Sequence, residues 1–76
     1  MKLKYDQEVD VLSILLGDGA VQESDESRPG IILDFDDRGS VVGIEILNAS
    51  QKIRDPMSVE YSIAREPLAG LKSRAD

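Results

Sequence analysis

One cluster of acidic residues has the types and spacing that could do chemistry: Asp34, Asp36, Asp37 and Glu45. With Gly39 it follows the pattern of a calcium-binding loop at every position but one. The exception is Arg38, which would put a permanent cation where a ligand oxygen is needed. Because both flanking segments have strand composition rather than helix composition, we interpret the motif as a hairpin turn. We expect no metal site and no cofactor, and these four acids remain weak candidates only.

The sequence contains no recognisable set of catalytic residues. The chain contains no histidine and no cysteine, which excludes the Ser-His-Asp and Cys-His nucleophile arrangements and thiolate or imidazole metal sites. Asp34 and Glu45 could form the kind of carboxyl pair used in acid–base catalysis, but such a pair needs a pocket that shifts one pKa. A chain of 76 residues has little material for that pocket, so we expect both acids on a solvated surface. We therefore predict no catalytic residues and no enzymatic activity.

The charge of the chain favours protein partners over nucleic acid. The formal net charge is −6, and residues 1–50 carry eleven acids against four bases. Nucleic acids are bound largely through lysine and arginine contacts to phosphates, so such a body would repel them. A basic protein partner fits the field better. The N-terminus lacks a signal-peptide pattern, and no apolar run approaches a membrane span, so we expect a cytoplasmic protein without membrane contact.

Alternating apolar and polar residues predict four strands, at residues 2–5, 11–16, 31–35 and 40–47. The polar stretch 22–30 is compatible with either a loop or a charged edge strand, and Pro29-Gly30 ends it with a turn in both cases. The three aromatic residues lie on apolar faces of strands and are core candidates: Tyr5, Phe35 and Tyr61.

The register of the hairpin at residues 31–47 can be argued from its pattern. A three-residue loop would oppose Leu33 to Gly43, mixing polar and apolar pairs on both faces. A four-residue loop at residues 36–39 opposes Leu33 to Val42, and we choose it because a sheet keeps one face apolar. This register gathers six residues on one face: Ile31, Leu33, Phe35, Val42, Ile44 and Ile46. It leaves Gly43 on the other face, opposite Ile32, and gives Gly39 the left-handed backbone position.

The C-terminal third is expected to hold one helix and one strand. Asn48-Ala49-Ser50 is a helix-start signal, which predicts a short helix over residues 49–54 before Pro56. Residues 58–64 alternate again and predict a final strand. We assign residues 1–65 to a single β-rich domain and residues 66–76 to a flexible tail.

Several segments together resemble the family of proteins of unknown function numbered 2283. They are residues 5–12, Leu15-Leu16, residues 29–36 and residues 41–50, of which Gly43-Ile44-Glu45-Ile46-Leu47 with Ala49-Ser50 is the most specific part. Asn48 stands where aspartate would be more usual. The resemblance implies a small prokaryotic protein and transfers no catalytic residues. Some members are suspected of being antitoxins beside small ribonuclease-like toxins.

We predict a mainly β fold (β-rich α+β), a single antiparallel sheet of about five strands with hairpins and one short helix. Because one short helix cannot cover the apolar face of a sheet, we expect a homodimer that packs the sheets face to face or pairs edge strands. Its central candidates are Leu12, Ile14, Leu33, Phe35, Ile44 and Tyr61. The expected function is a non-enzymatic protein-interaction module, in its specific form an antitoxin-like partner of a basic toxin. The alternative is a small-ligand or divalent-metal binder using Asp34, Asp36 and Glu45.

Overall fold

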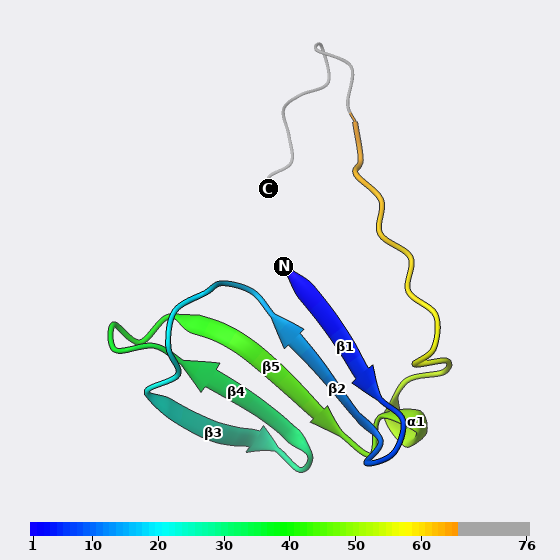
Figure 1. Ribbon diagram of the computed structural model, residues 1–76, viewed down its shortest axis with the longest axis horizontal. Helices are drawn as coiled ribbons and strands as arrows, with labels where there is room; N and C mark the ends of the chain where they lie inside the picture. The colour runs from blue at the N-terminus through cyan, green and yellow to red at the C-terminus, as the bar shows by residue number, and fades with distance from the viewer. Residues whose placement is uncertain (66–76) are drawn as a thin grey trace.

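The computed structural model describes residues 1–65 and shows one five-stranded antiparallel sheet with one short helix (Figure 1). The strands are β1 (Lys2–Asp6), β2 (Val11–Leu15), β3 (Glu23–Arg28), β4 (Ile31–Phe35) and β5 (Val41–Leu47). They lie side by side in the order β1-β2-β5-β4-β3. The mainly β fold predicted from the alternation is therefore confirmed, and the polar stretch left open between loop and strand forms the edge strand β3.

Three tight turns connect the neighbouring strands, and each contains a residue in the left-handed region. Asp10 (φ 60°) ends the β1–β2 turn, Gly30 (φ 78°) the β3–β4 turn and Gly39 (φ 81°) the β4–β5 turn. The two glycines adopt this conformation at little cost because they have no Cβ. Asp10 is a less expected choice, and the contacts of its side chain explain it below.

The four-residue loop predicted between β4 and β5 is wrong. The backbone N–H of Asp36 donates to the carbonyl of Ser40, so three residues separate the pair that closes the loop. The Asp36 carboxylate stabilises this tighter turn by accepting hydrogen bonds from the N–H groups of Arg38 and Ser40, both at 2.9 Å. A β-bulge then shifts the register, because the partner of Phe35 is Val41 while that of Asp34 is Gly43.

The bulge restores the two-sided pattern that the shorter loop alone would have lost. Beyond it Leu33 pairs with Ile44 and Ile31 with Ile46, two residues away from the predicted partners. Since a two-residue shift leaves a side chain on its original face, five of the six predicted residues stay together, and the sixth, Val42, lies in the bulge. Gly43 does face away from this set, but it lies opposite Asp34 rather than Ile32.

The sheet therefore has two faces of different character. We call the apolar face the side formed by alternate residues of β1, β2, β5 and β4: Leu3, Tyr5, Leu12, Ile14, Ile44, Ile46, Ile31, Leu33 and Phe35. The opposite side, the polar face, carries Lys4, Ser13, Glu45 and Asp34 among others.

Little of the apolar face is buried. In the part of the chain that the structure describes, Val42 and Ala49 are the only apolar side chains classed as buried, and no large side chain is fully enclosed. The central candidates Leu12, Ile14, Leu33, Phe35 and Ile44 are half-buried on the apolar face. One layer of secondary structure cannot shield that face from water, as the sequence led us to expect.

The C-terminal segment departs from the prediction. Helix α1 spans Ala49–Lys52 and is shorter than the predicted residues 49–54, because Ile53 is already extended. Residues 58–64 are extended but pair with no strand within residues 1–65, so the predicted final strand is wrong. Tyr61 is 74% exposed rather than central. We call residues 53–65 the arm; the predicted tail, 66–76, lies outside the described residues.

Candidate functional site

Two of the four acidic candidates meet on the polar face. Asp34 of β4 is 7% exposed, which corrects the expected solvated surface position. Its Oδ1 accepts a hydrogen bond of 2.6 Å from Ser24 Oγ of the edge strand β3. Its carboxyl group also lies close enough to that of Glu45 on β5 to raise the pKa of Glu45. The expectation that Asp34 and Glu45 are near neighbours across strands is thus confirmed.

The glycine opposite Asp34 makes room for this carboxyl pair. A Cβ at Gly43 would lie 3.1 Å from Oδ2 of Asp34, tighter than an ordinary contact. The cross-strand hydrogen bond and the nearby Asp34 charge raise the pKa of Glu45, with partial burial acting in the same direction. The two carboxyl groups therefore disfavour simultaneous ionisation, and the pKa of Glu45 lies above its ordinary value.

The other two acidic candidates belong to the β4–β5 turn. Asp36 uses Oδ1 to accept two backbone hydrogen bonds within the turn, and Asp37 is an exposed turn residue. Within residues 1–65, no three acidic side chains converge as the ligands of a metal ion would. The structure brings Asp34 together with Glu45 and gives Asp36 a separate, structural task.

Replacing Glu45 by glutamine is expected to raise the melting temperature at neutral pH by roughly 2–5 °C. A group whose folded-state pKa is raised contributes stability below its ordinary value, here 4.5, and loses it as pH rises through the raised value. At neutral pH the ionised Glu45 therefore costs stability beside Asp34, and glutamine removes that cost. Thermal unfolding followed by circular dichroism between acidic and neutral pH measures the effect.

The matched control is Glu23→Gln, which changes an exposed acid on β3. It should shift the melting temperature little at any pH. The advantage of the Glu45→Gln variant should shrink as pH falls towards 4. A Glu45→Gln variant that is less stable than the parent at neutral pH would contradict a repulsive carboxyl pair.

A second polar cluster fastens α1 to the β1–β2 turn. The carboxylate of Asp10 accepts hydrogen bonds from the Tyr5 hydroxyl (2.6 Å), the Ser50 N–H (2.9 Å) and the Ser50 hydroxyl (2.7 Å). The Asp10 carbonyl accepts a further bond from the N–H of Ala49, 3.0 Å long. Aspartate tolerates the left-handed backbone conformation because its short side chain can form local hydrogen bonds. This accounts for the φ of 60° at Asp10.

No local sequence pattern predicts this cluster, because Asp10 and its partner Ser50 are 40 residues apart. The available signal was the recurring Ala49-Ser50 at the end of the most specific segment, whose physical meaning becomes visible only when the two loops meet. The cluster has a structural task, since all its polar groups bond one another.

The apolar face and the arm enclose two open hollows. The first, of about 280 Å³, is lined on one side by Leu3, Tyr5 and Leu12, and on the other by arm residues that include Ile53, Met57 and Val59. The second, of about 460 Å³, lies next to it and is lined by Leu3, Ile14, Val59 and Tyr61 among others. The arm therefore crosses the β1–β2 half of the face without packing closely on it.

These features define a small protein with one open-faced sheet, whose candidate site is an apolar surface rather than a catalytic pocket. Comparison of the sequence with known protein families defines this class more narrowly. Residues 2–50 match the family described as "Protein of unknown function (DUF2283)", and the chain belongs to that family. The match covers all five strands and ends at Ser50, the residue that bonds Asp10. The expected membership is confirmed, and the arm lies beyond the matched segment.

The chain is similar to "Uncharacterized protein MJ0789" of Methanocaldococcus jannaschii. The two are 45% identical over 51 residues, which is 67% of this chain. The chain spans 43% of the length of that relative. No solved structure matches the chain. The single helix found in residues 1–65 has four residues and is too short to cross a bilayer.

Proposed function

We propose that this protein is a non-enzymatic protein-interaction module. The observation that carries the proposal is the apolar face, whose nine side chains are half-buried or exposed although they form the largest apolar surface of the sheet. Contiguous exposed apolar surface of this kind marks a contact site for another protein. The functional residues are then those of the apolar face, and the protein acts by binding in the cytoplasm rather than by catalysis.

A second surface supports a specific form of this function, an antitoxin-like partner of a basic protein. Edge strand β3 is exposed along its whole length and carries Glu23, Asp25 and Glu26. With a formal net charge of −6, the chain would attract a basic partner electrostatically and accelerate their encounter. Charged residues on an edge strand also discourage pairing with strands of other chains. The acidic residues of β3 would therefore attract a basic partner without promoting aggregation.

The test is co-expression with a small basic protein encoded beside this chain. Growth inhibition by that protein should be relieved by the parent chain, and the two should purify together. A variant with Glu23, Asp25 and Glu26 changed to glutamine or asparagine should give weaker rescue, whereas Lys2→Gln on the opposite edge is the charge control. A neighbour that is neither bound nor neutralised would remove the antitoxin form of the proposal.

The alternative function is divalent-metal or small-ligand binding at Asp34, Asp36 and Glu45. One observation favours it: Asp34 and Glu45 are brought together on the polar face. Asp36 is committed to the turn, however, because its Oδ1 accepts two backbone hydrogen bonds there. Calorimetric titration with calcium, magnesium and manganese decides, and heat of binding that Asp34→Asn abolishes would favour this alternative.

A further inference from the structure

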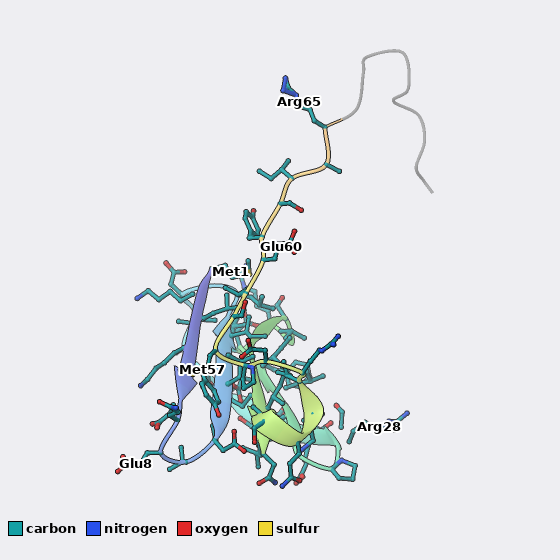
Figure 2. All side chains as sticks on the ribbon, turned by 90° about the vertical axis from the view of Figure 1, so that its right-hand side faces the viewer. Met1, Glu8, Arg28, Met57, Glu60 and Arg65 are labelled. Carbon is teal, nitrogen blue, oxygen red and sulfur yellow. The ribbon has the colours of Figure 1, made fainter. Side chains whose placement is uncertain are left out.

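The first part of the argument concerns the arm. Val59, Tyr61 and Ile63 are 70%, 74% and 77% exposed and alternate with Ser58, Glu60 and Ser62. In an extended chain this spacing puts the three apolar side chains on one side. In Figure 2, Met57 lies beside the sheet, Glu60 lies near Met1 at the start of β1, and Arg65 lies well beyond the sheet. The arm thus carries a strand-like apolar stripe that stays largely exposed, although Val59 and Tyr61 line hollows against β1 and β2 of the same chain.

The second part concerns the half of the apolar face that the arm leaves open. The hollows place the arm over β1 and β2. The side chains on β5 and β4, among them Ile44, Ile31 and Leu33, line neither hollow, and each remains half-buried. One chain therefore offers an apolar stripe that remains largely exposed, and a β4–β5 half of the apolar face that its own arm does not cover.

The edges of the sheet are poorly suited to pair with their own kind. Two β3 edges would bring acidic residues together, and the bulge between Glu26 and Arg28 further disturbs that edge. Two β1 edges would bring Lys2 and Lys4 of each copy together. Pairing β1 of one copy with β3 of the next would be head-to-tail and would give an open row rather than a closed dimer. This leaves the apolar face.

The charge at the end of the arm complements the rim of that face. Arg54 and Arg65 flank the apolar stripe of the arm. Glu23 and Asp25 pair with Phe35 and Leu33, so their side chains border the apolar face on the β3 side. Asp55 and Glu60 balance these two bases, so the arm has no formal net charge and only its basic end at Arg65 would be drawn towards the acidic rim of another copy.

The areas agree with a dimer only when the arm is included. The four strands of the apolar face, at a spacing of about 4.8 Å and a length of about 17 Å, cover roughly 330 Å². The three exposed side chains of the stripe, at roughly 100 Å² each, add about as much. Two copies would then bury about 1,300 Å² in total, within the range of a standard stable interface, whereas the faces alone would give about half.

We propose that a second copy of this chain covers the apolar face, with Val59, Tyr61 and Ile63 of each arm seated on the β4–β5 half of its partner's face. This inference rests on the proposed function, because it names an occupant of the same face. The two sheets would face each other as in a β-sandwich. The arm of each protomer would lie on the apolar face of the other.

The first experiment measures the mass of the full chain in solution by sedimentation. The parent should be a dimer at tens of micromolar. A variant with serine at positions 59, 61 and 63 should dissociate about tenfold or more readily, since those side chains supply about half the contact. The matched control changes the other side of the same arm, with Ser58→Asn, Glu60→Gln and Ser62→Asn, and should remain dimeric. Circular dichroism checks that each variant keeps its sheet.

The second experiment locates the contact. Because the chain has no cysteine, single-cysteine variants need no prior changes. Mixing Tyr61→Cys with a differently tagged Leu33→Cys chain under mild oxidation should give a disulfide-linked mixed dimer. Mixing Tyr61→Cys with Asp37→Cys, in the β4–β5 turn, is the control and should give little.

The outcomes separate the inference from the function on which it rests. The inference would be overturned if the parent is a monomer. It would also be overturned if the serine substitutions in the arm leave the dimer unchanged and no mixed disulfide forms. If such a monomer still binds and neutralises a basic partner, and Leu33→Asp abolishes that binding, the interaction module stands without the dimer. A dimer that binds no other protein would leave self-association as the whole of the interaction.

Discussion

The Asp10→Ala variant is expected to melt at a temperature lower than the parent by on the order of 10 °C. The substitution removes an ionised acceptor that binds three donors, the Tyr5 hydroxyl and two groups of Ser50. It also leaves an alanine in the left-handed region, where its Cβ is strained. Thermal unfolding of the purified chain at neutral pH measures the loss.

Matched variants divide this effect into its parts. Asp10→Asn keeps an oxygen acceptor and tolerates the left-handed backbone, so it should lose less than alanine does. Tyr5→Phe and Ser50→Ala remove one side-chain donor each and should be milder again. The exposed control Asp18→Ala should have the melting temperature of the parent. If Asp10→Ala also has the melting temperature of the parent, the cluster does not hold α1 to the sheet.

The same cluster makes the stability depend on pH at both extremes. The Tyr5 and Ser50 hydrogen bonds lower the pKa of Asp10 below 3.8, so its contribution holds above that value and is lost as pH falls through the lowered one. The hydrogen bond to Asp10 raises the pKa of Tyr5 above 10.0, so its contribution holds below that value and is lost as pH rises further. The Tyr5→Phe variant should lack the alkaline loss.

Replacement of Ala49 by leucine is expected to lower the free energy of unfolding by about 1–3 kcal/mol. Ala49 is 0% exposed, and its N–H and carbonyl are both engaged, with Asp10 and Ile53. A longer side chain there must push α1 away from the β1–β2 turn or strain its rotamer. Urea unfolding of the variant measures the change.

The control for this substitution lies two residues further along the same helix. Gln51→Leu adds similar apolar bulk at an exposed position of α1 and should change the free energy of unfolding by less than about 0.5 kcal/mol. Equal effects at positions 49 and 51 would mean that Ala49 is not enclosed in solution.

The alternation of residues predicts the strands well because it is a local property. It places Leu12 with Ile14 and Ile44 with Ile46 on one face without knowledge of their partners. It does not settle which residues pair, because the Asp36 turn and the bulge near Phe35 depend on the hydrogen bonds of one side chain. Beyond the bulge the predicted partners are wrong by two residues and the predicted faces are right, whereas at the bulge Val41 pairs with Phe35 of the apolar face.

In the arm, by contrast, the alternation of residues predicts a strand that the structure does not contain within residues 53–65. Residues 58–64 have the alternation of a strand, but a strand also needs a neighbour, which no local pattern can supply. For the candidate site, the nearness of Asp34 and Glu45 follows from the strand pattern. The burial of Asp34 does not, because it depends on Ser24 and on the paired edge strand β3.

The strand order has a consequence for how the chain reaches its native state. Three of the four strand pairs join strands that are neighbours in sequence, and the β2–β5 pair alone joins segments far apart, such as Leu12 with Ile46. The β1–β2 hairpin and the β3–β4–β5 meander can each form early, and closing the long loop between them is the slow entropic step. The contacts of Asp10 with Ser50 and of Leu16 with Val42 lie at the two ends of that junction. Both ought therefore to form late, so that weakening them speeds unfolding more than it slows folding.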